Sequence, residues 1–297
     1  MRSSIDRGVL YMLLASLLFA FMGAFAKLSS MHMSPLEVVF FRNVFGVALI
    51  LGSFWHRPMR QKGGKLWLLL FRGTMGFLAL LAFFYNIAHI PLGDAITFSK
   101  TSPFFTALFA MLLLGERLSM RGWVALGIGF AGIVLVAKPQ GLAFAYTDYI
   151  GIFSGLGAAL AYLSVRELRH YYEIRTIVLS FVTIGTVGPL LLMLVSPYLT
   201  HESLAFARGE FVLPHGIVWL YVAGMGVAAT AAQLLMTKAY ATTQAGIVGA
   251  ASYANIPFAI GVGFILGDAF PDMITLSGIA LIIAAGSMVA FVTKEKQ

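Results

Sequence analysis

The sequence predicts an all-α integral membrane protein whose ten transmembrane helices form two inverted five-helix repeats. Hydrophobic residues make up 60% of the 297 residues and charged residues only 11%, whereas soluble domains carry about 25% charged residues. A soluble fold with so little polar surface could not cover itself, and the mean hydropathy is +0.89. Two further observations support this fold class: apolar runs of membrane-spanning length recur along the chain, and the two halves resemble each other.

Apolar runs of about 18 or more residues, bounded by charges or turn residues, are typical of membrane-spanning helices. Ten such runs follow one another, and the longest hydrophilic connection, about residues 197–214, is too short for a separate soluble domain. The predicted spans are residues 8–27, 34–54, 65–88, 93–114, 120–138, 148–167, 174–196, 215–237, 244–267 and 272–293.

The first span has an alternative interpretation as a secretory signal peptide. Arg2 and Arg7 precede its apolar core, and Ala24-Phe25-Ala26 resembles a cleavage site. The core nevertheless exceeds the usual length of about 7–15 residues, and its removal would leave nine spans and break the repeat. We therefore expect the first span to stay in the bundle.

The basic residues predict the orientation. With the N-terminus in the cytoplasm, fourteen lysines and arginines lie in cytoplasmic segments and only Lys27, Lys138 and Arg208 lie outside. Cytoplasmic loops carry such an excess, so both termini are predicted to be cytoplasmic, in the inner cell membrane. This distribution accounts for the net charge of +8 without a nucleic-acid partner. The remaining basic residues, Arg42, Arg72 and Lys100, lie within spans.

An internal repeat divides the chain. PLGDAITFSKTSPFFTALFAMLLLGE at 91–116 resembles AGIVGAASYANIPFAIGVGFILGD at 245–268, and a glycine-containing apolar span follows each. Five spans per half is an odd number, so the second copy must be inverted across the membrane. We expect a first repeat at residues 1–143 and a second at 144–297, an architecture that secondary transporters use with the solute site between the halves.

At these residues the chain resembles the drug/metabolite transporter superfamily, and within it the ten-span EamA family. The resemblance rests on the N-terminal apolar segment, SPLEVVFFRN at 34–43, the entrance to the fourth span and the spacing of Pro103 to Glu116. Asp268 stands where the family pattern has a second glutamate. The resemblance implies a carrier of small organic metabolites or drugs, often outward, with proton or exchange coupling.

Two cations inside spans predict a site for an anionic group. By helical rise, Arg42 and Lys100 lie roughly 12 Å and 10 Å below the outer ends of their spans. A charge facing lipid costs at least about 2.5–3.5 kcal/mol, so such residues usually face the bundle interior. Pro103 cannot donate to the carbonyl of Ser99, which should break the helix beside Lys100. Arg42 could instead pair with Glu37, and Lys100 could pair with Asp94 or extend outward.

Other polar residues complete the predicted substrate site: Tyr85, Asn86, Gln233, Tyr253 and Asn255. By repeat symmetry Tyr253 and Asn255 should face Lys100, although hydrogen bonding between helices would also explain such residues. Pro103 and Pro257 are the predicted hinge or gating positions. Arg72 is expected to extend to the cytoplasmic headgroups.

The motifs exclude several function classes. The chain has no cysteine, its six histidines lack metal-ligand spacing, and no GxxxxGK[ST] loop is present, so we expect no metal, no cofactor and no ATP hydrolysis of its own. The GxGxxG at 127–132 lies inside an apolar span without the strand that a dinucleotide site needs.

The leading hypothesis is a secondary transporter, an exporter, of a small organic metabolite bearing a carboxylate or phosphate, working by alternating access. A cationic-drug or multidrug exporter is the alternative within transport, but it would want an acid near mid-membrane. An enzyme acting on lipid-linked phosphates and a membrane scaffold or assembly protein without substrate are alternatives from other classes. The expected partners are the solute and the bilayer; proton coupling, solute exchange and a homodimer all stay open.

Overall fold

The computed structural model describes residues 2–56, 62–102, 104–105, 108–109, 112, 120–137, 144–168, 170–198, 201–242 and 251–294. These residues form helices and their connections, with no strand among them. The α-helices are α1 (Arg2–Ser30), α2 (Pro35–His56), α3 (Leu66–His89), α4 (Leu92–Ser99), α6 (Met120–Ala137), α7 (Tyr146–Leu168), α8 (Ile174–Val195), α9 (Val218–Thr242), α11 (Asn255–Ile265) and α12 (Met273–Lys294), and two short 3-10 helices, η1 (Ser196–Tyr198) and η2 (Glu202–Ala207), connect α8 to α9.

Within the described ranges, six helices are long and apolar enough to cross a membrane: α1, α2, α3, α7, α8 and α9. Shorter apolar stretches lie in α6, α11 and α12. The predicted all-helical class with several apolar spans is therefore confirmed. The predicted spans 93–114 and 244–267 fall partly outside the described residues, which include α4 from the first and α11 from the second.

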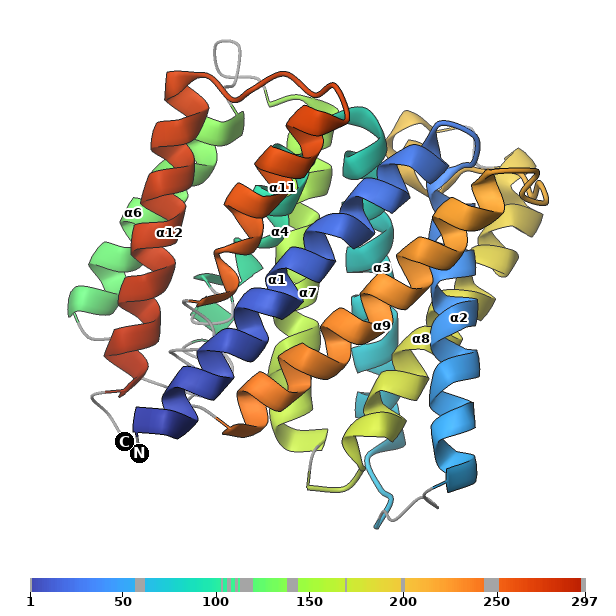
Figure 1. The fold of residues 1–297 in the computed structure, drawn as a ribbon, viewed down its shortest axis with the longest axis horizontal. Helices are drawn as coiled ribbons and strands as arrows, with labels where there is room; N and C mark the ends of the chain where they lie inside the picture. The colour runs from blue at the N-terminus through green and yellow to red at the C-terminus, as the bar shows by residue number, and fades with distance from the viewer. Residues whose placement is uncertain are drawn as a thin grey trace.

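The helices form a bundle in which segments distant in sequence lie side by side (Figure 1). The contacting pairs include α1 with α9, α3 with α7, α2 with α8, and α6 with α12. α12 ends near the beginning of α1, so both chain termini lie at one end of the bundle, here called the terminus end (Figure 1). α1 and α2 are joined at the opposite end, here called the far end.

Glycines let several of these helices approach closely. Gly132 of α6 and Gly278 of α12 face each other, and a Cβ on either would lie 2.8 Å or 2.7 Å from the other's carbonyl oxygen. A Cβ on Gly73 of α3 would collide with Ile184 of α8. Small residues are favoured between membrane helices because lipid provides little hydrophobic drive and the helices must gain van der Waals contact instead.

A capping box starts α2 at the far end. The carboxylate of Glu37 accepts hydrogen bonds from the backbone and side chain of Ser34, at 2.7 Å and 3.0 Å. Its second oxygen accepts the backbone N–H of Val212 at 2.6 Å. Such a box satisfies donors that the first turn leaves unpaired, and here it also fixes the chain that follows η2.

The chain after α11 turns back onto two other helices. Gly267 has a φ of 93°, a conformation that glycine adopts without steric cost. The backbone N–H of Asp268 donates to the backbone carbonyl of Gly263 at 2.9 Å. This C-cap directs the Asp268 carboxylate to the N–H of Leu92 at 2.9 Å, while the same carboxylate pairs with Lys27. We call Lys27, Leu92 and Asp268 the far-end clasp.

Candidate functional site

Lys100 lies at a break in the fourth span. α4 ends at Ser99, and the chain turns at Lys100 and Thr101 before helical geometry resumes. The Thr101 hydroxyl donates back to the carbonyl of Phe98 at 2.6 Å. Lys100 is half-buried, and it forms no ion pair with a carboxylate of the described chain. The predicted cause, Pro103, lies outside the described residues.

Helix α7 covers one side of this break. A Cβ on Gly155 would collide with Thr101, and a Cβ on Gly151 would lie 2.5 Å from the Phe98 ring and 2.8 Å from the Asn86 amide. These two glycines therefore let α7 approach both α4 and α3. The approach holds the turn at Lys100 inside the bundle.

Tyr85 and Asn86 lie near the far end of α3. The Asn86 amide is 1% exposed and donates to the carbonyl of Thr147 at 2.9 Å, while its oxygen accepts no hydrogen bond from the described residues. The Tyr85 ring stacks on His89 at 4.0 Å and meets Tyr146 edge-on at 5.6 Å. Both side chains bridge α3 to the start of α7.

The predicted residues of the second half lie in α9 and around the start of α11. The Asn255 amide donates to the carbonyl of Ser16 on α1 at 2.7 Å, and Tyr253 is buried in the preceding turn. Gln233 is half-buried on α9. Pro257 is the third residue of α11, in the first turn, where a proline removes no helical hydrogen bond. Its role as a hinge stays a prediction.

Arg42 and Arg72 converge on one aromatic ring. The guanidinium carbon of Arg42 on α2 lies 5.4 Å from the centroid of Phe181 on α8, and that of Arg72 on α3 lies 5.2 Å from the same centroid. Both arginine side chains are 8% exposed. We call Arg42, Arg72 and Phe181 the arginine cluster.

Neutral groups surround the arginine cluster. Arg42 donates to the side-chain oxygen of Asn43 at 2.8 Å, and Asn43 donates to Val39 and to Gly185 on α8 at 2.8 Å and 3.1 Å. Glu37, the predicted alternative partner of Arg42, is engaged in the capping box instead. Among the described residues neither Arg42 nor Arg72 has a hydrogen-bond partner for its Nε.

The burial of Arg72 corrects one expectation. Arg72 does not extend to the headgroups but lies buried against Phe181. A Cβ on Gly76 would collide with its guanidinium, so the glycine one turn later provides the space for it. The FRGTMG stretch contains this signal, because a glycine four residues after an arginine leaves room for the side chain on the same helix face.

The contacts described so far join neither Arg42 to Lys100 nor Asn255 to Lys100. Arg42 is held by α2 and α8, Lys100 follows α4, and Asn255 is held by α1. A single chamber containing all seven predicted substrate residues therefore stays a prediction.

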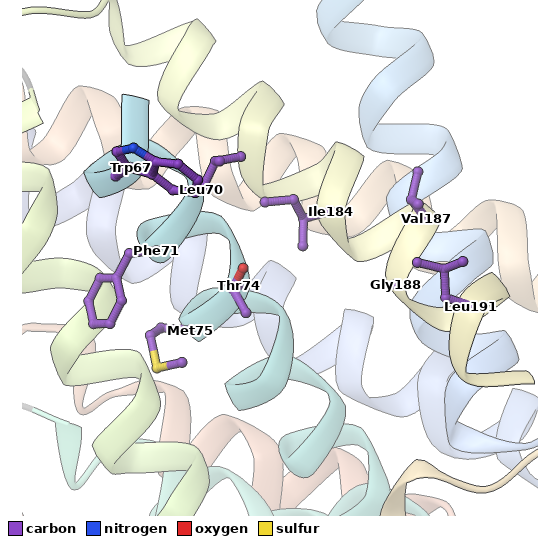
Figure 2. A pocket seen from close by; sticks show the side chains of 9 residues that line it. All are labelled: Trp67, Leu70, Phe71, Thr74, Met75, Ile184, Val187, Gly188 and Leu191. Atoms are coloured by element: carbon purple, nitrogen blue, oxygen red, sulfur yellow. The ribbon is translucent and has the colours of Figure 1, made fainter. Parts of the chain in front are cut away.

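A large open groove lies elsewhere, between α3 and α8. Its volume is about 580 Å³, and Figure 2 shows side chains of both helices along it. It is lined by Trp67, Leu70, Phe71, Thr74, Met75, Ile184, Val187, Gly188 and Leu191. With one hydroxyl, one indole N–H and no charge, this surface suits contact with acyl chains better than it suits a charged solute.

Comparison with known proteins identifies the family. Residues 6–138 match the model of the EamA-like transporter family. An uncharacterized transporter of Helicobacter pylori is 35% identical over 98% of this chain and 96% of its own. The chain belongs to the EamA-like transporter family.

Other relatives of this EamA-family protein carry more specific names. The pseudopaline exporter CntI of Pseudomonas aeruginosa is 34% identical over 94% of both chains. A riboflavin transporter of Vibrio cholerae is 26% identical over 97% of this chain and 93% of its own. A solved crystal structure superposes with a TM-score of 0.59 at 20% identity over 98% of both chains, which shows a shared fold.

These findings confirm the predicted resemblance to the drug/metabolite transporter superfamily. The protein is a multi-pass membrane protein of a transporter family rather than an enzyme family, and its partners are a small-molecule solute and the bilayer.

Proposed function

We propose that this EamA-family protein is a secondary transporter that exports a small organic anion by alternating access between two inverted five-helix halves, residues 1–143 and 144–297. The observation that carries the proposal is Lys100, a cation at a helix break inside the bundle with no ion-pair partner in the described chain. Irregular backbone at membrane depth is tolerated where it is buried in protein or lines a water-filled cavity, and carriers use such breaks to bind solutes.

The helix pairings support the inverted halves. α1 contacts α9 and α7 contacts α3, while α2 contacts α9 and α8 contacts α3. If the first three helices correspond to α7, α8 and α9 in that order, the pair α1–α9 corresponds to the pair α7–α3. The pair α2–α9 likewise corresponds to the pair α8–α3. α2 runs toward the terminus end and α8 runs away from it (Figure 1), as inversion requires.

Reciprocal contacts support the exchange at residue level. α2 and α8 each have 22 residues; Asn43 and Val182 are the ninth residue of each, and Gly46 and Gly185 the twelfth. A Cβ on Gly46 would lie 3.0 Å from Val182, and a Cβ on Gly185 would lie 2.5 Å from Asn43. Each contact becomes the other when the helices are exchanged.

The charges favour an anionic solute over a cationic drug. Arg42, Arg72 and Lys100 place positive charge within the spans, and a cation carrier would need a carboxylate at similar depth. Tyr85, Asn86, Gln233, Tyr253 and Asn255 are the proposed sources of stacking and hydrogen bonds for the rest of the solute. The name of the Pseudomonas relative supports outward transport.

Counterflow in proteoliposomes tests the proposal. Vesicles preloaded with an unlabelled mixture of succinate, citrate, glutamate and a phosphate monoester such as glycerol 3-phosphate should accumulate at least one of these anions in radiolabelled form. Lys100→Met should abolish accumulation, whereas Lys62→Met, an exposed lysine in the loop before α3, should not. Equal accumulation by wild type, Lys100→Met and empty vesicles would refute the proposal and favour the scaffold alternative.

A further inference from the structure

The arginine cluster carries two permanent positive charges, because a guanidinium stays protonated in proteins. Their carbon atoms lie within about 11 Å of each other, since each is close to the centroid of the same Phe181 ring. Both side chains are 8% exposed. Two charges of one sign are thus held together inside the bundle, where an uncompensated charge costs several kcal/mol.

No acid of the described chain compensates these charges. The described ion pairs all lie elsewhere, at Lys27, Lys65 and Arg175. Contact with an aromatic face recovers only about 0.5–2 kcal/mol, and the bond to Asn43 is to a neutral amide. Both Nε atoms are buried without a hydrogen-bond partner among the described residues, so each guanidinium retains donor capacity.

Arg175 shows what a compensated arginine looks like in the same protein. Its guanidinium also lies over an aromatic ring, Phe54, at 4.8 Å. It donates to the carboxylate of Glu173 at 2.6 Å and to the carbonyl of Ser53 at 3.2 Å. The arginine cluster has the same stacking without the carboxylate.

A tyrosine lies beside the arginine cluster. Tyr162 on α7 lies near both guanidinium groups, and its side chain is 53% exposed. The phenol therefore links the neighbourhood of two buried cations to the surface of α7. A hydroxyl there can also donate to an anion.

We propose that Arg42 and Arg72 together bind a dianionic group, one phosphate monoester or two carboxylates, and that this group belongs to the transported solute. The inference rests on the proposed function and narrows its substrate class from anions to dianions. Two fixed positive charges are neutralised by two negative ones, and the planar guanidinium fork matches carboxylate and phosphate oxygens. Phe181, which both guanidinium groups contact, holds the two forks in place.

Thermal unfolding of the purified protein tests the inference, with succinate, inorganic phosphate and acetate as probes at equal ionic strength and about pH 8, where succinate and phosphate are both mainly dianions. Succinate or phosphate should raise the unfolding midpoint of wild type with an affinity about tenfold or more above that of acetate. The preferred probe distinguishes paired carboxylates from a single phosphoryl group. Arg42→Gln and Arg72→Gln should each weaken that affinity at least about tenfold, whereas Arg175→Gln, the matched control, should leave it unchanged.

A purely structural role predicts a different pattern. Arg42→Gln and Arg72→Gln would then lower the unfolding midpoint without ligand and leave the affinity for the dianion unchanged. That result would overturn the inference. Equal binding of acetate, succinate and phosphate by wild type would overturn it too. If the glutamine variants fail to fold, Arg42→Lys and Arg72→Lys replace them, because lysine keeps the positive charge but lacks the guanidinium fork. An unchanged dianion affinity in both lysine variants would also overturn the inference. Counterflow by wild type without dianion preference would refute this inference alone, whereas absence of counterflow would refute the proposed function.

Discussion

Lys27 at the end of α1 and Asp268 beyond α11 form an ion pair that joins two segments distant in the sequence at the far end of the bundle. The same carboxylate accepts the N–H of Leu92, the first residue of α4. The Asp268 side chain therefore connects the far-end termini of α1, α4 and α11. These contacts would have to break for the three helices to separate at this end.

Weakening the far-end clasp should expose α4. The chain has no cysteine, so Ala95→Cys, at a buried position one turn into α4, supplies a single reporter for a water-soluble maleimide in nanodiscs. Adding Asp268→Asn should speed labelling about tenfold, equivalent to about 1.4 kcal/mol. Lys27→Met should act less strongly, because it spares the bond to Leu92. Equal labelling in all three backgrounds would show that the clasp does not control access.

The packing of α2 against α8 should tolerate an added methyl group less well at Gly185 than at Gly46. A Cβ on Gly185 would lie 2.5 Å from Asn43 Nδ2, whereas one on Gly46 would lie 3.0 Å from a valine methyl group. Gly185→Ala should therefore destabilise the protein by about 1–3 kcal/mol and displace Asn43 from Arg42. Gly46→Ala should cost less, and Gly52→Ala, with open space around it, should cost nothing. Unfolding in a denaturant series measures the order, and a reversed order would contradict this packing.

Asn255→Ala should destabilise the protein by about 0.5–1.5 kcal/mol, because the hydrogen bond from its amide to the buried carbonyl of Ser16 joins α11 to α1. Because Asn255 is also a proposed solute ligand, we expect the transport rate to fall further than the loss of folded protein explains. Transport that falls only in proportion to the folded fraction would limit Asn255 to a structural role.

The ion pair of Lys65 and Glu167, at the terminus end, should give stability a small pH dependence. The side chains meet at 2.6 Å; hydrogen bonding to Lys65 lowers the pKa of Glu167, and the same bond raises the pKa of Lys65. The stabilisation is present above the ordinary pKa of a glutamate and is lost as the pH falls through the lowered value. It is also lost at alkaline pH, as the pH rises through the raised pKa of Lys65.

Unfolding midpoints of wild type and Glu167→Gln should therefore differ slightly near neutral pH and converge in acid. Both groups are about half exposed, which keeps the effect small. A difference that grows on acidification would contradict the assignment.

The helices could be predicted from the sequence because apolar runs bounded by charges determine where a chain can cross lipid. The predicted spans 34–54 and 65–88 correspond to Pro35–His56 and Leu66–His89. The break at Lys100 could be predicted as well, since Pro103 signals it locally.

The arginine cluster could not be predicted in the same way. Depth along a helix follows from counting residues, but the neighbour of a long side chain depends on which helix lies opposite. Nothing in the sequence near Arg72 shows that Phe181, over a hundred residues later, provides the ring that it stacks on. The same holds for Asn255, whose partner Ser16 comes from the first helix.

Lys100 follows the last residue of α4, where the carbonyl groups of a helix end sum to roughly half a negative charge. This helix dipole offsets part of the cost of keeping an ammonium group inside the bundle without an acidic side chain beside it. Under the proposed function, an arriving anion would then displace no carboxylate. The same partial charge would repel the bound anion slightly, which would favour its release over tight retention.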